Sequence, residues 1–333
     1  WIENKVNNYM NKLMQTDKKD YVIASDTDSI YVTFGSLIDK FKPNNPVDFL
    51  NTIAKEKLEP FIDKSYQELA NYTNAYAQKM QMKREVIADK GIWTAKKRYI
   101  LNAHDVEGVR YKEPQLKIMG IEAVKSSTPA PCRQKIKDAL KIIMSGDEKM
   151  LNTFIQDFRE EFVNLPPEDI AYPRSVNGIF KFTDNETSRK RTQKKFEERE
   201  KKKSGDVKDV LIGTLDNAKV KYGLFASGAP IHVKGAILYN HLVEKKNLGN
   251  KYPYINEGEK IKFLHMMEPN VYQSSAISFV TDLPKELDIH NKIDYTLQFE
   301  KSFIEPLKFI TDKILWKIDV SYGTQGTLED FFG

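Results

Sequence analysis

Two aspartates lie two residues apart in a segment whose flanks are rich in β-branched and aromatic residues. Asp26 and Asp28 belong to Asp26-Thr27-Asp28-Ser29, which is typical of turns, and residues 21–25 and 30–32 flank it. The pattern predicts a tight β-hairpin with both carboxylates at its tip, where the side-chain period of two lets them face the same way. Neighbouring acids repel each other unless a cation neutralises them, and Mg²⁺ is held by one or two protein carboxylates plus substrate phosphates. The alternative is an Asx-type turn whose acids cap backbone amides.

The elements around this segment follow from the spacing of apolar residues. Helical spacing over residues 2–14 predicts an amphipathic helix that leads into the hairpin. A second helical pattern covers residues 49–62, and strands are predicted at 83–88 and 92–100. Helices packed behind a small antiparallel sheet make an α+β module, so we expect an α+β fold.

Length and composition limit the class of protein. The 333 residues suffice for one large or two medium domains, and 40% hydrophobic with 30% charged residues is typical of a globular protein. A single cysteine, Cys132, excludes a disulfide framework and a Cys-based zinc site. No apolar run approaches the ~20 residues that span a bilayer, so no membrane partner is expected. Because the first residue is Trp1, we expect the chain to be part of something longer.

A basic triplet lies in the stretch predicted as a strand at 92–100. Lys96, Lys97 and Arg98 stand between Trp93 and Tyr99. Alternation along a strand turns at least one of the three toward the other face, where a cation needs an anion. Nucleic-acid phosphate and a neighbouring carboxylate are both suitable partners. The alternative is a solvated surface face.

The hairpin resembles a known active-site motif. Asp26-Thr27-Asp28-Ser29-Ile30-Tyr31-Val32 is similar to the palm-domain motif of family B DNA polymerases, and most similar to that of T4-like bacteriophages. The resemblance implies that Asp28 ligates two catalytic Mg²⁺ ions together with an aspartate from an earlier palm motif. It implies that Asp26 is a supporting acid and that Glu85 is a further acid near the metals.

The basic triplet resembles the Lys-Lys-Arg-Tyr motif of the same polymerases, ending at Tyr99. The resemblance implies that Lys97 lies along the minor groove at the primer terminus, with Lys96 and Arg98 on the DNA backbone, and that Tyr99 is also a DNA-binding residue. Minor-groove acceptors are alike at A·T and T·A pairs, so one lysine can check pairing geometry without reading sequence.

Residues 115–129 are similar to the passage from palm to thumb in the T4-like enzymes. Lys125, Ser126, Ser127 and Thr128 offer charge and hydroxyls suited to a phosphodiester backbone. The same residues also suit the start of a helix at Pro129, and the two roles are compatible because a helix N-terminus binds phosphate.

The resemblance implies a domain organisation. We expect residues 1–125 to form part of a palm, an antiparallel sheet with helices, and 126–320 to form a mainly helical thumb with a small β region. The run from 188 to 203 has nine Lys or Arg against three Glu and no apolar face, so 188–210 is expected to be a solvated insertion, with an auxiliary DNA contact as the alternative.

The tail, residues 321–333, carries its own pattern. Gln325 is followed by Leu328 at i+3 and by Phe331 and Phe332 at i+6 and i+7, which matches sliding-clamp-binding peptides. One helical turn would place the three apolar side chains on one side as a plug for a pocket. A structural tail would bury the phenylalanines in its own domain, and we favour the clamp.

The implied reaction is template-directed DNA synthesis from deoxynucleoside triphosphates on primer-template DNA, in the cytoplasm of an infected bacterial host. The family's other palm aspartate motif, its fingers helix and its exonuclease domain are absent from the sequence. We therefore expect the chain to be inactive alone. It is either a fragment of a longer protein or the C-terminal subunit of a split polymerase that needs an N-terminal partner.

Two other functions fit part of the pattern. A non-catalytic module could bind primer-template DNA and tether the sliding clamp, with Asp26 and Asp28 purely structural. A nucleotide-sugar transferase also uses an Asp-x-Asp pair, but it explains neither the basic triplet nor the tail.

Overall fold

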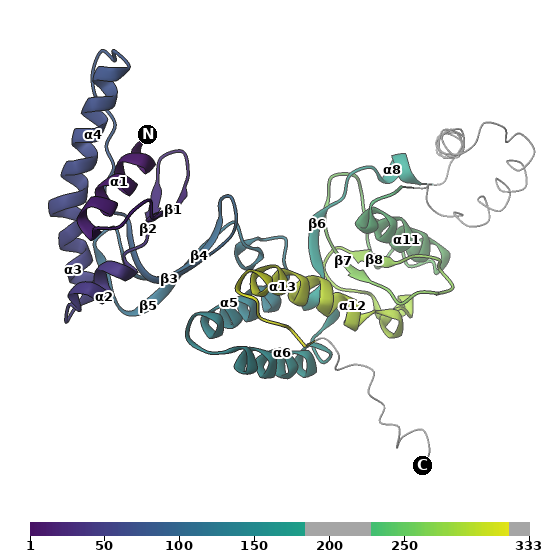
Figure 1. Cartoon of the computed structure of the whole chain (residues 1–333). Helices are drawn as coiled ribbons and strands as arrows, with labels where there is room; N and C mark the ends of the chain where they lie inside the picture. Colours follow the sequence, from purple (N-terminus) through teal and green to yellow (C-terminus); the bar gives the residue numbers. More distant parts are fainter. Residues whose placement is uncertain (184–227, 320–333) are drawn as a thin grey trace, which may run out of the picture. The chain divides into compact units, whose positions relative to one another are not determined.

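The computed structural model describes residues 1–183 and 228–319 (Figure 1). The chain divides into two compact units, the first running from Trp1 to Ile121 and the second beginning at Glu122. The 188–210 insertion and the tail fall outside the described residues. The palm and thumb assignment, with its boundary after residue 125, stays a prediction.

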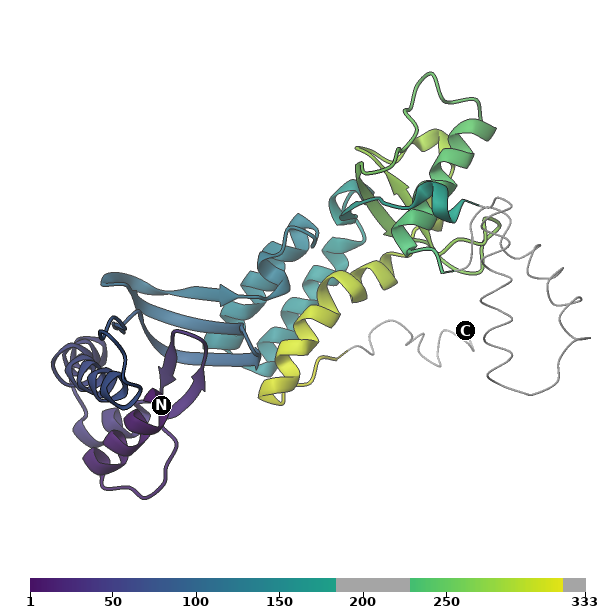
Figure 2. The same cartoon turned by 90° about the horizontal axis from the view of Figure 1, so that it is seen from above.

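Helices and antiparallel strands alternate in the first unit. Its elements are α1 (Ile2–Met14), β1 (Val22–Ser25), β2 (Ile30–Val32), α2 (Gly35–Phe41), α3 (Pro46–Ile53), the π-helical turn η1 (Ala54–Leu58), α4 (Glu59–Tyr72), β3 (Val86–Ala95), β4 (Arg98–Val106) and β5 (Val109–Met119). β1 pairs with β2, and β3, β4 and β5 form a three-stranded antiparallel sheet (Figure 2). The helix predicted at 2–14 and the hairpin after it are confirmed.

Apolar packing attaches the first hairpin to the helices. The buried residues of this core are Val6, Met10, Tyr21, Val22, Ile62 and Tyr66, from α1, the start of the hairpin and α4. Val6 and Met10 are four positions apart on α1 and so share one face of that helix. The amphipathic pattern that predicts the helix therefore also places it against the hairpin.

Two π-helical turns stand immediately before prolines. η1 precedes Pro60, and η5 (Glu300–Ile304) precedes Pro306. Proline lacks an N–H group, and its ring clashes with the carbonyl four residues earlier. A wider turn accommodates both effects. The helix around Pro306 continues through α12 (Tyr295–Phe299), η5 and α13 (Glu305–Thr311).

The second unit combines helices with a three-stranded sheet. Its further elements are η2 (Glu122–Val124), α5 (Ala130–Ser145), α6 (Glu148–Phe162), α7 (Pro167–Ile170), β6 (Tyr172–Ser175), α8 (Ile179–Phe182), α11 (Ile231–Lys245), β7 (Lys260–His265), β8 (Ala276–Phe279), η3 (Lys285–Leu287), η4 (His290–Lys292) and η6 (Asp312–Ile314). The sheet has the order β6-β7-β8 and is antiparallel. The predicted α+β class is confirmed.

Two close packings hold the second unit together. Phe158 of α6 and Phe303 of η5 meet edge to face with centroids 4.8 Å apart, inside a cluster with Phe162 and Phe299. At Gly235 of α11 a Cβ atom would lie 2.6 Å from the Ser278 Oγ atom on β8, so the helix approaches the strand as only glycine allows. No helix in the described ranges has both the length and the apolarity that crossing a membrane requires.

Candidate functional site

The hairpin that carries the two acids ends in a short turn. Ser25 pairs with Ile30, and the Asp26 backbone N–H donates to the Ser29 carbonyl at 2.9 Å. Thr27 and Asp28 are therefore the two residues at the tip. The prediction that both acids stand at the end of a tight hairpin is confirmed.

Two asparagines on α1 anchor the chain that leads into the hairpin. The Asn7 Oδ1 atom accepts hydrogen bonds from the N–H groups of Tyr21 and Val22 at 2.8 and 2.9 Å. Asn11, one turn later, binds both the N–H and the carbonyl of Lys19. The sequence interpretation missed these residues, although asparagines at i and i+4 beside an apolar stripe are a readable signal.

Asp26 is held as a carboxylate. Its Oδ1 atom accepts a hydrogen bond from the Thr27 N–H at 2.8 Å, and the Lys97 Nζ atom lies 3.8 Å away. The hydrogen bond from Thr27 lowers the pKa of Asp26 below its ordinary value, and the charges of Lys97 and Lys96 lower it further. The capped amide belongs to the next residue rather than to the one two positions on that an Asx turn caps, so the alternative is met only in that one of the two acids caps a backbone amide.

Asp28, unlike Asp26, is not held by contacts of its carboxylate with other described residues. It is exposed and forms no hydrogen bond or ion pair with any residue of the described ranges. Its carboxylate is accordingly available to a ligand without breaking an interaction of the fold. A cation placed at the tip would meet this carboxylate and, beside it, that of Asp26.

The basic triplet lies elsewhere than the sequence predicts. Ala95 pairs with Arg98, so Lys96 and Lys97 form the turn between β3 and β4 rather than part of one strand at 92–100. Alternation along a strand therefore does not apply to them. Lys97 adopts the left-handed backbone conformation, with φ of 59°, which is typical of turns. Its side chain reaches the Asp26 carboxylate because the turn projects it.

The end of β5 packs closely against the turn between β3 and β4. Gly120 has φ of 67°, and a Cβ atom there would lie 2.6 Å from the Lys97 carbonyl oxygen. The Arg98 Nε atom donates to the Gly120 carbonyl at 3.0 Å. Glycine at this position lets the chain pass directly beneath the basic turn.

Aromatic residues join the two hairpins. The ring of Tyr31 on β2 meets those of Trp93 on β3 and Tyr99 on β4, each with centroids 5.3 Å apart. Burial raises the pKa of Tyr99, and a hydrogen bond with Tyr31 and the charges of Glu85 and Asp26 raise it further. Tyr99 is half-buried, and its ring supports the site by packing against Tyr31. Edge-to-face packing of this kind fixes the acidic tip relative to the basic turn.

Glu85, the third predicted acid, pairs with a different lysine from the one that lies beside Asp26. Glu85 is exposed and forms an ion pair with Lys117 at 3.6 Å. Across residues 1–183 and 228–319, no three His, Cys, Asp or Glu side chains gather closely enough to hold a metal ion. The hairpin does offer two hard oxygen donors, which fits Mg²⁺, an ion that takes one or two carboxylates and completes its shell with water and phosphate.

The second predicted DNA-binding group belongs to the second unit. Lys125 pairs with Glu122 at 2.7 Å, and the Ser127 carbonyl accepts a hydrogen bond from Arg174. Ser126 is exposed, whereas Thr128 is only 6% exposed. α5 begins after Pro129 with no side-chain cap, so the expected hydroxyl cap does not form. Of the three hydroxyls, Ser126 is the most accessible to a phosphate.

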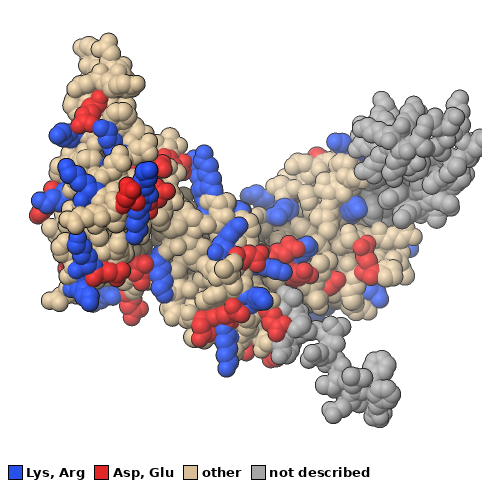
Figure 3. Space-filling view, in the orientation of Figure 1, with Lys and Arg blue, Asp and Glu red and all other residues tan. Residues whose placement is uncertain are grey.

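Charge on the surface is mixed rather than segregated. Figure 3 shows basic and acidic side chains interspersed across the face drawn. DNA binding at this face would therefore depend on particular cations rather than on a broad positive field. The predicted clamp-binding residues Gln325, Leu328, Phe331 and Phe332 lie outside the described residues.

Comparison with known proteins adds a family context to this geometry. The chain is 31% identical to the DNA-directed DNA polymerase of Enterobacteria phage T4 and 35% identical to that of Escherichia phage RB69. Both alignments include 100% of the chain. The chain matches phage DNA-directed DNA polymerases along its whole length. It spans 34% of the length of each of these relatives. No family model matches it.

Proposed function

We propose that the chain is the C-terminal part of a family B DNA polymerase and contributes half of its palm together with its thumb. The whole-length similarity to two phage polymerases supports DNA synthesis as the function. The observation that carries the proposal is the acidic hairpin tip, with exposed Asp28 beside ionised Asp26 and within reach of a lysine turn.

Each residue of the tip has a separate role in this proposal. Asp28 binds the metal directly because its carboxylate has no competing partner in the described chain. Asp26 adds negative charge, and its Thr27 cap holds the pKa of that carboxyl below the ordinary value. When bound, Mg²⁺ activates the primer 3′-hydroxyl and neutralises the triphosphate and leaving group. Glu85 is a peripheral acid of the same site.

The lysine turn acts on the DNA. Lys97 contacts the minor groove at the primer terminus, and Lys96 and Arg98 contact the backbone, with Tyr99 holding the turn in place. In the second unit Lys125 and Ser126 contact DNA backbone, and Ser127 and Thr128 shape the backbone that presents them. The tail residues Gln325, Leu328, Phe331 and Phe332 bind the sliding clamp.

The remaining polymerase parts come from outside this chain. An earlier palm aspartate and the groups that bind the triphosphate would be supplied by an N-terminal portion or subunit, so the chain is inactive alone. The phage sources of the two relatives support a role in replication in infected bacterial cells.

Primer extension with Mg²⁺ tests the proposal. We expect no extension by the chain alone and extension when the missing N-terminal portion is added as a separate polypeptide. Purified chain that extends primers by itself would contradict the need for a second part. Failure of every mixture, with primer-template binding retained, would contradict the enzymatic function.

One observation favours a second candidate, a non-catalytic module that binds DNA and tethers the clamp. Asp26 is capped by Thr27 and lies beside Lys97, as in a purely structural turn. In that case replacing Asp28 would leave synthesis by the assembled enzyme unchanged. The polymerase proposal requires the opposite.

A further inference from the structure

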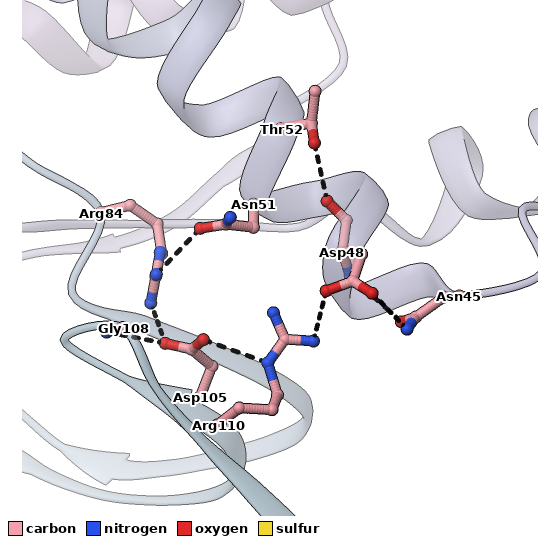
Figure 4. A network of polar contacts seen from close by, with 8 residues as sticks. All are labelled: Asn45, Asp48, Asn51, Thr52, Arg84, Asp105, Gly108 and Arg110. Carbon is pink, nitrogen blue, oxygen red and sulfur yellow. Dashed lines mark hydrogen bonds and ion pairs between the residues drawn. The ribbon is translucent and has the colours of Figure 1, made fainter.

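A second polar site lies within the first unit, away from the acidic tip in sequence. Residues of α3, η1, the segment before β3, β4, β5 and the turn between these two strands line a pocket of about 360 Å³. Figure 4 shows the polar contacts among the lining residues other than Lys55. This volume is within the range of small-ligand sites. The charged and amide residues that matter are Asp48, Asn51, Lys55, Arg84, Asp105 and Arg110.

Groups of the chain itself already engage both acids of the pocket. Asp105 is 2% exposed, and its carboxylate receives Arg84, the Gly108 N–H at 3.0 Å and Arg110 at 3.2 Å. Asp48 receives Arg110 at 2.7 Å through one oxygen and the Asn45 amide through the other. Both carboxylates are therefore occupied by groups of the chain itself.

Donors, in contrast, remain available. The Arg84 Nε–H is buried without a hydrogen-bond partner, on a side chain that is 10% exposed. Lys55 forms no hydrogen bond or ion pair within the described ranges. Three cations face two carboxylates around the pocket, which leaves one positive charge in excess. Because the Arg84 Nε atom has almost no accessible surface, Lys55 is the donor that a ligand in the pocket would meet, and the arginines contribute their charge.

We propose that this pocket binds an oxyanion of the phosphate class. Lys55, Arg84 and Arg110 come from three different elements, η1, the segment before β3 and β5, so their donors approach from different directions. A tetrahedral oxyanion offers acceptors in several directions, and arginine is well suited to bind it. The ligand is either free phosphate or the phosphate of a nucleotide. The inference does not depend on the polymerase function.

Calorimetric titration of the whole chain with inorganic phosphate tests the site. Lys55→Ala should weaken binding about tenfold, because one charge-assisted hydrogen bond is lost. Lys57→Ala is the matched control, since Lys57 is also exposed on η1 but does not line the pocket. Equal affinity in the two variants, or no binding by the unmodified chain, would overturn the proposal.

Lysine acetylation followed by mass spectrometry gives a second test that needs no variant. Phosphate should slow the modification of Lys55 severalfold and leave that of Lys57 unchanged. Equal rates with and without phosphate would also overturn the proposal. Repeating the titration with deoxyadenosine monophosphate distinguishes the sources: tighter binding than phosphate that is still weakened by Lys55→Ala identifies a nucleotide, and weaker binding identifies free phosphate.

Discussion

The first unit contains two groups of acids and bases that are arranged in opposite ways. At the hairpin tip, Asp28 is exposed and has no partner within the described residues, and Lys97 lies 3.8 Å from Asp26. In the pocket network, Asp105 is buried and each of its oxygens is occupied (Figure 4). The network uses its carboxylates to hold β3, β4 and β5 against α3. The tip holds its carboxylates in place through backbone and aromatic contacts, which leaves Asp28 available for chemistry.

The largest effect on activity should come from the tip. Asp28→Asn in the assembled enzyme should lower primer extension on the order of a thousandfold, because a metal-binding carboxylate supplies several kcal/mol of transition-state stabilisation. Thermal melting should be unchanged, since Asp28 makes no ion pair in the described chain. Asp39→Asn, an exposed acid on α2, is the control. Full activity of the Asp28 variant would favour the binding module.

The largest effect on stability should come from the network. Asp105→Asn leaves the buried charge of Arg84 without its ion-pair partner, so we expect a loss of about 3–5 kcal/mol in the free energy of unfolding. Urea denaturation measures this loss. Asp89→Asn on β3, whose acid is half exposed, should cost less than about 1 kcal/mol. Similar losses for the two variants would contradict the expectation that the buried ion pair of Asp105 stabilises the fold more than the half-exposed acid Asp89 does.

Acid should weaken the network as well. Burial alone would raise the pKa of Asp105, but hydrogen bonds from Arg84 and the Gly108 N–H outweigh burial and leave the pKa below 3.8. Because the folded pKa lies below the unfolded one, this acid contributes stability that is complete above pH 3.8 and is lost as the pH falls through the folded pKa. Urea midpoints between pH 6 and pH 3 should fall less steeply in Asp105→Asn. Parallel slopes in the two proteins would contradict this.

The smallest effect concerns the pair at the tip. Lys97→Ala should leave thermal melting unchanged, because its side chain is 65% exposed and exposed ion pairs stabilise little. The pKa of Asp26 should move toward 3.8 but stay below it, since the Thr27 N–H remains bound. Carboxyl NMR titration measures this shift. A pKa that reaches or exceeds 3.8 would show that Lys97, not Thr27, controls the acid.

Local patterns predicted the first helix, the acidic hairpin and the α+β class. Their signals span only a few residues: apolar spacing along α1, and turn residues between β-branched runs at Asp26 and Asp28. The basic triplet was placed wrongly because Lys96 and Lys97 lack the glycine or asparagine that usually marks a two-residue turn. Nothing near Pro306 indicates the π-helical turn that lets its helix continue.

The sequence by itself determined the candidate residues for the chemistry, the first helix and the acidic hairpin, because these depend on side-chain type and on short-range periodicity. Only the tertiary structure decided which groups meet. It placed Lys97 beside Asp26 through the packing of Tyr31 on Trp93 and Tyr99, and it enclosed Asp105 between Arg84 and Arg110. Except for Asp105 and Arg110, these contacts join residues 21 to 71 positions apart, and sheet register and core packing determine them rather than local sequence.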